Sequence, residues 1–184
     1  MNADLIYKHL EMLIAVAPKV SRVAVLANPR SSSHASMLRN LQSAAQRAGI
    51  SIVPAEARSR QEIENAFASQ VRQSAAAIIV LLDPIFQQQK TQIVELSAKH
   101  RLPSIGMFRE YAEAGGLMSY GANLAGVILR AATYVDKIFK GEKPGDIPVE
   151  QPTKFELFIN GKTARALGLN IPQSLLVMAD KVIE

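Results

Sequence analysis

The chain has 184 residues, 48% of them hydrophobic and 20% charged, which is enough for one well-packed domain but not for two of equal size. Lysine and arginine outnumber aspartate and glutamate by 21 to 16. These basic residues are scattered and do not alternate with aromatic ones, which argues against a nucleic-acid surface. Cysteine is absent and the three histidines show no ligand spacing, so we expect neither a metal nor a cofactor.

The N-terminal stretch MNADLIYKHLEML is amphipathic and carries acidic residues, unlike a secretory signal. No stretch approaches the roughly 20 apolar residues of a membrane span. If the protein works outside the cytoplasm, we expect its export signal to be missing from this chain.

Hydrophobic spacing predicts helices and strands that alternate along most of the chain. The predicted helices are 3–17, one from the serines after Pro29 to Gly49, 60–72, one through 93–98, 109–114, 123–139, 161–167 and a terminal segment. The predicted strands are one starting at Val23, then 50–54, 75–82, 103–108, 117–120 and, as an edge strand, 154–160. The first four strands start about 27 residues apart, a rhythm typical of a parallel α/β sheet with right-handed crossovers.

Polar and aromatic residues follow several of these strands, and a parallel sheet brings such strand ends to one edge. Helices that begin at this edge offer free N–H groups to a ligand. Each residue taken alone is better explained as a turn former or a helix cap, but the whole set together favours a ligand-binding edge. The set is Asn28, Pro29, Ser31, Ser32, Ser33, Asp83, Pro84, Phe108, Tyr120, Gly121 and Asn123.

The sequence gives little support for a catalytic site. Ser32, His34 and Asp83 suggest a hydrolase, but His34 lies two residues from Ser32 at a helix start, so we expect it to point away, and no G-x-S-x-G elbow is present. A receiver-like role for Asp83 requires an acidic pair after the first strand, where this chain has Asn28-Pro29. No glycine-rich phosphate loop follows any strand. The chain therefore fits binding better than catalysis.

Longer segments point to a family. SRVAVLANP, the Asp83-Pro84 pair, AKHRLPSIGMFREYAEAGGLMSYGANL and the stretch from AATYVDKIF to ADKVIE closely resemble substrate-binding proteins of a bacterial ABC-transporter family that includes tryptophan-binding lipoproteins. The resemblance covers nearly the whole chain. It implies a type I periplasmic-binding-protein fold, in which two lobes close on a small ligand. This chain corresponds to the second lobe, with a flavodoxin-like, Rossmann-type parallel sheet; a signal or lipidation segment and a first lobe are expected before its first helix.

The resemblance also implies a function: solute binding for an importer, outside the cytoplasm, with an ABC permease as partner and without catalysis. The ligand is expected to be a small organic molecule, such as an amino acid or an aromatic compound. Amides at Ser31–Ser33 would receive a carboxylate, Phe108 or Tyr120 would stack, and Asp83 would meet an amine. A cytoplasmic sensing or interaction module built from the same lobe is the alternative, and an enzyme using Asp83 is the weakest one.

Residues 123–153 correspond by the same resemblance to a segment that crosses to the first lobe. The predicted helix 123–139 carries six apolar residues on one face, and this face has lost its partner if the first lobe is absent. We expect the helix to pair two copies of the chain in a homodimer. The alternative is that the helix folds back on its own sheet.

Overall fold

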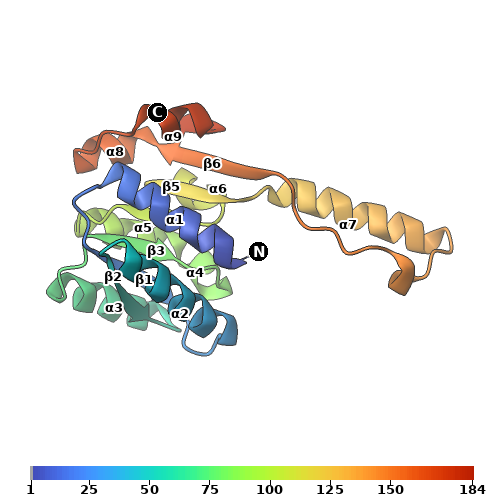
Figure 1. Cartoon of the computed structure of the whole chain (residues 1–184), viewed down its shortest axis with the longest axis horizontal. Helices are drawn as coiled ribbons and strands as arrows, with labels where there is room; N and C mark the ends of the chain where they lie inside the picture. Colours follow the sequence, from blue (N-terminus) through green and yellow to red (C-terminus); the bar gives the residue numbers. More distant parts are fainter. Residues whose placement is uncertain (1) are drawn as a thin grey trace.

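A seven-stranded sheet in the order β2-β1-β3-β4-β5-β6-β7 runs through the computed structural model, which describes residues 2–184 (Figure 1). The strands are β1 (Arg22–Ala27), β2 (Ser51–Glu56), β3 (Ala77–Val80), β4 (Ser104–Gly106), β5 (Met118–Ala122), β6 (Phe155–Asn160) and β7 (Lys181–Ile183). The first five are parallel, β6 is antiparallel to β5, and β7 is parallel to β6. The predicted parallel α/β fold is confirmed.

Helices cover both faces of the sheet. They are α1 (Asn2–Val16), α2 (Ser32–Arg47), α3 (Arg60–Arg72), α4 (Pro84–Gln88), α5 (Lys90–Lys99), α6 (Arg109–Glu113), α7 (Leu124–Phe139), α8 (Gly161–Leu167) and α9 (Gln173–Met178), with a 3-10 turn η1 (Pro144–Asp146). One face packs against α1, α2 and the C-terminal helices, and the other against α3, α4, α5 and α6. The switch from one face to the other falls at β1, which has β2 on one side and β3 on the other.

The central strands are apolar because both of their faces are covered. In β1, Val23 and Val25 enter the core under α1 and α2, whereas Ala24 and Leu26 enter the core under α3 and α5. All four residues of β3 are buried. Because successive residues of these strands enter opposite cores, every position must be apolar. The resulting unbroken apolar runs made these strands predictable.

Two predictions about the C-terminal third are wrong. β6 was expected at the edge of the sheet, but it pairs with β5 on one side and β7 on the other. The terminal segment was expected to be helical throughout; it is helical in α9 but ends in β7, whose three residues are too few to show a strand period. In the middle of the chain, the predicted single helix after β3 is two: Asp83 and Pro84 start the short α4, which ends before α5 begins.

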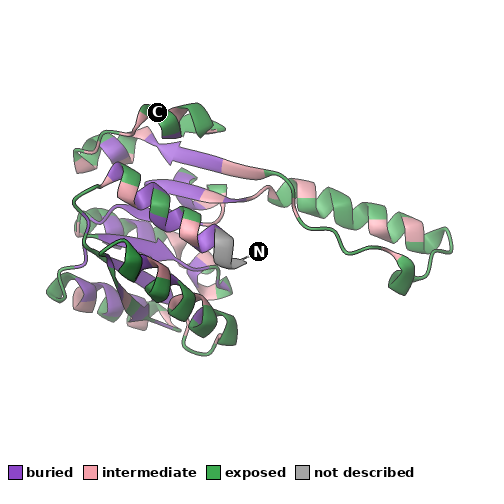
Figure 2. Cartoon of the chain, viewed as in Figure 1, coloured by how far each residue is buried: buried purple, intermediate pink, exposed green. Residues whose placement is uncertain are grey.

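An arm, defined as residues 123–154, projects from the body (Figure 1). It consists of α7, η1 and an extended return to β6. None of the residues of α7 is buried, and Figure 2 shows the arm almost entirely exposed. The exposed large side chains of α7 are Leu124, Val127, Ile128, Leu129, Val135, Ile138 and Phe139. The alternative in which this helix folds back on its own sheet is therefore wrong.

The return segment lies along one side of α7. The Tyr134 hydroxyl donates to the carbonyl oxygen of Pro148 over 3.3 Å, and Arg130 forms an ion pair with Glu150. A groove of about 520 Å³ lies between the helix and residues 150–154. Across the described part of the chain, the helices all fall short of the length and apolar character that crossing a bilayer requires.

Candidate ligand-binding edge

The carboxyl ends of β1, β3, β4 and β5 lie at one edge of the sheet, because these four strands are parallel neighbours. Most of the predicted site residues follow these strands and therefore share this edge, whereas Tyr120 and Gly121 lie within β5. The arm leaves from the same edge, since α7 begins two residues after β5 ends (Figure 1). In open parallel sheets this edge is where ligands bind, above all next to the switch point.

At the switch point the structure brings Asn28 and Asp83 together. The side-chain amide of Asn28 donates to one carboxylate oxygen of Asp83 over 2.9 Å. The other oxygen of Asp83 accepts the backbone N–H of Ile85 over 3.0 Å and so caps α4. The side-chain oxygen of Asn28 accepts the backbone N–H of Arg30. Both residues thus form turns and caps, and they also tie β1 to β3.

His34 completes this cluster, a role that was not predicted from the sequence. Its ring is buried between the ends of β1 and β3, where it contacts the backbone of Asn28 and of Leu82. Sequence reasoning judged this histidine only as a partner of Ser32 in a hydrolase. Its place at the buried position of the first turn of α2 was the signal that could have revealed its role.

Ser31–Ser33 lie at the start of α2, on the solvent side of this cluster. Ser31 is the N-cap residue, with φ −88° and ψ 111°, but its side chain makes no capping hydrogen bond. Its hydroxyl instead lies 2.9 Å from that of Ser33. Pro29, Ser32 and Ser33 are exposed, and Pro84 is the first residue of α4.

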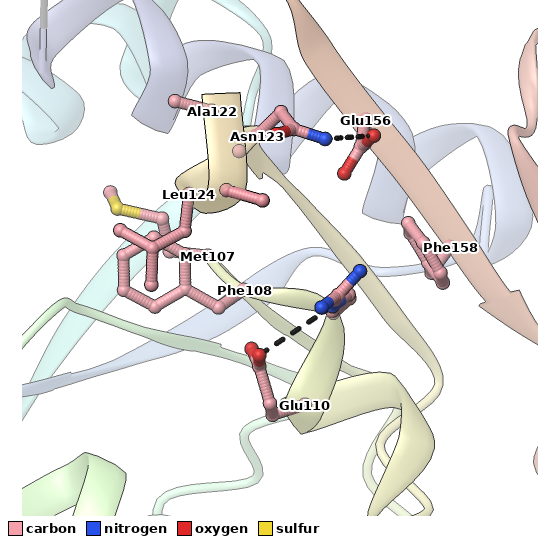
Figure 3. Close-up of a pocket in the computed structure, with 11 residues that line it drawn as sticks. Met107, Phe108, Glu110, Ala122, Asn123, Leu124, Glu156 and Phe158 are labelled. Carbon is pink, nitrogen blue, oxygen red and sulfur yellow. Dashed lines mark hydrogen bonds and ion pairs between the residues drawn. The ribbon is translucent and has the colours of Figure 1, made fainter. Parts of the chain in front are cut away.

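Phe108, Gly121 and Asn123 line a small hollow beside the root of the arm (Figure 3). Figure 3 shows Phe108 beside Leu124 and Met107, with Phe158 on the opposite side. The side-chain amide of Asn123 donates to the Glu156 carboxylate, and its oxygen caps α7. The hollow measures about 20 Å³, room for roughly one water molecule.

Gly121 has a structural reason to be glycine. A Cβ atom built on it would lie 2.1 Å from the backbone oxygen of Met107, far inside van der Waals contact. The close approach of β5 to the loop after β4 shapes the floor of the hollow.

Tyr120 lies apart from both clusters. Its ring stacks on Phe155 with a centroid distance of 5.9 Å, and the ring of His9 meets it edge-on at 6.3 Å. The Nε2 of His9 donates to the carbonyl oxygen of Tyr120 over 2.6 Å. Burial disfavours the charged imidazolium and lowers the pKa of His9 to about 4. His9 is therefore a neutral core residue that fixes β5 under α1.

Comparison with known protein families identifies the family of this chain. A family model described as ABC transporter substrate binding protein matches residues 1–183. The chain belongs to this family. Its members are binding proteins rather than enzymes. Comparison with curated proteins found no match.

Several solved structures share the fold. A conserved domain protein from Vibrio cholerae is 25% identical, with a TM-score of 0.86 over 95% of this chain and 59% of its own. A Streptococcus pneumonia protein described as an ABC domain in complex with L-Trp is 24% identical, with a TM-score of 0.86 over 96% of this chain and 59% of its own. A ligand-free, open substrate-binding protein with adhesive properties from Clostridium difficile is 21% identical, with a TM-score of 0.72 over 97% of this chain and 59% of its own.

The chain spans 59% of the length of each of these three proteins. The carboxyl edge of this chain is shallow, because the hollow at Phe108 is far smaller than the roughly 300 Å³ that even small ligand pockets enclose. The described residues place the predicted side chains at this edge in two clusters, one around Asn28 and Asp83 and one around Phe108 and Asn123, and leave Tyr120 outside them.

Proposed function

We propose that the chain is the second lobe of a two-lobed solute-binding protein and holds a small organic ligand against the carboxyl edge of its sheet. One observation carries this proposal. The arm starts at the same edge as the polar clusters and extends beyond it, so a lobe packed on the arm would face those clusters. Two facing lobes would then supply the enclosure that the shallow edge of one lobe lacks.

The arm is the proposed crossing segment to the first lobe. Apolar residues recur on α7 with alternating spacings of four and three, which makes one continuous stripe. The stripe consists of Leu124, Ile128, Ala131, Val135 and Ile138, all of them exposed. Roughly several hundred Å² of apolar surface lies open here, which monomeric proteins seldom leave uncovered. A first lobe that covers the stripe removes this exposure.

The proposed ligand is an amino acid or an aromatic compound. The backbone amides at the start of α2, beside exposed Ser32 and Ser33, suit a carboxylate. Half-buried Phe108 offers a flat apolar surface. Asp83 is 7% exposed, and each of its carboxylate oxygens already accepts one hydrogen bond. An amine of the ligand would therefore bind a carboxylate that also accepts from Asn28 and caps α4. L-Trp, named for the Streptococcus protein, is a ligand of this class.

The same proposal includes transport outside the cytoplasm, with an ABC permease as the partner of the two-lobed protein, and no catalytic turnover. For the 184-residue chain in isolation we propose a homodimer, in which the stripe on α7 of one copy covers that of the other.

A thermal-shift screen of amino acids, nucleosides and aromatic acids against the two-lobed protein tests the ligand assignment. At least one compound should raise its melting temperature, and Phe108→Ala should reduce that shift. Val177→Ala is the matched control, because Val177 is exposed on α9 and belongs to neither cluster, and it should leave the shift intact. A Phe108→Ala protein that responds as the control does would remove the hollow from the site, and a screen without any response would contradict the proposal.

A further inference from the structure

The ring of His34 occupies the switch point between β1 and β3. His34 is 3% exposed although it belongs to the first turn of α2, next to exposed serines. Its Nδ1 accepts the backbone N–H of Asn28 over 2.9 Å, and its Nε2 lies 2.9 Å from the carbonyl oxygen of Leu82. Because a backbone N–H only donates and a carbonyl only accepts, the ring carries its proton on Nε2 and none on Nδ1.

This ring takes the place of the next step of the β ladder. The last regular link between the strands runs from the N–H of Leu81 to the carbonyl of Leu26 over 3.1 Å. Beyond it, the N–H of Asn28 and the carbonyl of Leu82 face opposite nitrogens of the imidazole. The two strand ends are therefore held one ring-width apart.

A second link fixes the same gap. The Asn28 side chain reaches across to Asp83, the residue after Leu82, over 2.9 Å. Asn28 and Asp83 thus keep their turns in contact on one side of the ring, while the ring separates the backbones. The exposed serines follow directly on one turn and α4 on the other.

We propose that His34 is a positioning residue of the ligand edge: its neutral imidazole, protonated on Nε2, sets the spacing between the turn after β1 and the turn after β3. It touches no ligand and performs no chemistry. It acts through the Asn28 and Leu82 backbones, which carry Ser31–Ser33 and Asp83 into place. The inference rests on the proposed function for its effect on binding, but the spacing itself does not depend on it.

Two measurements on the 184-residue chain test the spacing. ¹⁵N NMR of the wild-type chain at neutral pH should show His34 as the neutral tautomer protonated on Nε2. Hydrogen exchange of the Asn28 amide should accelerate about tenfold in His34→Ala, while amides of buried β3 keep their wild-type protection. His34→Gln, which can accept with Oε1 and donate with Nε2, should restore most of the protection.

His100→Ala is the matched control, because His100 caps the far end of α5 and makes no contact with this edge. It should leave the exchange of Asn28 unchanged. A ring protonated on both nitrogens, or an Asn28 amide equally protected in His34→Ala and in the control, overturns the inference. If His34→Ala fails to fold, the tautomer and the His34→Gln protein still decide it.

The binding consequence is measured separately in the two-lobed protein, with L-tryptophan as the probe. His34→Ala should weaken binding and His34→Gln should recover it. A two-lobed protein that binds no solute contradicts the proposed function and leaves the spacing result standing. Accelerated exchange of Asn28 together with unchanged affinity for a bound probe would confine His34 to the fold and overturn its role at the site.

Discussion

Asn28 and Asp83, 55 residues apart in sequence, are joined by a 2.9 Å hydrogen bond from the side-chain amide of the first to the carboxylate of the second. The bond closes the switch point of the sheet. The carboxylate that caps α4 is also the one that we propose binds an amine of the ligand, so a structural role and a proposed ligand role fall on one residue. The two roles separate experimentally, because capping acts on stability and ligand contact acts on affinity.

Replacing Asp83 by alanine should lower the free energy of unfolding of the chain by about 1–2 kcal/mol, because α4 loses its cap and Asn28 loses its acceptor. Urea unfolding followed by circular dichroism measures this. Glu64→Ala, at an exposed position of α3, is the control. In the two-lobed protein the same substitution should also weaken ligand binding by roughly 1.5–3 kcal/mol if Asp83 pairs an amine. Calorimetry that shows unaltered affinity would leave Asp83 as a cap alone.

Acid should destabilise the chain through His9. Its pKa is lowered from 6.5 to about 4 by burial, so between these values the unfolded chain binds the proton and the folded chain does not. Stability contributed by the neutral ring is therefore complete above pH 6.5 and is lost as pH falls to 4, by up to about 3 kcal/mol. The measurement is the difference in unfolding free energy between the wild type and His9→Gln across this range, and a constant difference would contradict it.

Gly121→Ala should destabilise the chain by about 1–3 kcal/mol, because the new methyl group would lie 2.1 Å from the Met107 oxygen. Gly145→Ala is the control, since a Cβ atom there meets nothing within 4 Å. Thermal unfolding of both variants compares the two sites. Equal melting temperatures would show that β5 moves away from β4 at little cost, and that the hollow beside Phe108 is not rigid.

The arm should pair two copies of the chain in solution. Light scattering over a dilution series should give a dimer mass for the wild type and a monomer mass for Ile128→Glu plus Val135→Glu, because both residues lie exposed on the stripe. Val177→Glu, at a still more exposed position but on α9, should remain dimeric. A wild-type chain that is monomeric at every concentration would rule the homodimer out.

Most of the fold was predictable because its strands are buried on both faces and its helices carry one apolar stripe. Val23 to Leu26 and the run before Asp83 show this directly. The three residues of β7 are too few to show the two-residue period of a strand, so β7 was not predicted. Because β7 pairs with β6, β6 is not the edge strand that was expected. The direction of α7 was not encoded locally either, since an apolar stripe shows that a helix needs a partner but not where the partner lies.

The candidate site was predictable as an edge but not as contacts. Asn28, Asp83, Phe108 and Asn123 could be predicted to share an edge, because they follow parallel strands whose carboxyl ends lie together. Tyr120 was expected at a strand end, but β5 continues to Ala122, and the Tyr120 ring packs against His9 of α1 and Phe155. The position of His34 between the two strand ends was not predicted, because its hydrogen-bond partners are backbone atoms of residues 28 and 82 and no side-chain motif indicates such contacts.

The most direct test of the central claim is amide chemical-shift mapping of the ¹⁵N-labelled chain titrated with amino acids and aromatic acids at millimolar concentration. A single open edge should bind such a ligand weakly, with shifts concentrated at Ser31–Ser33, Phe108 and Asn123 and absent from α9. Shifts that cluster away from the carboxyl edge, or a chain that responds to none of these compounds, would contradict the assignment of a ligand-binding lobe.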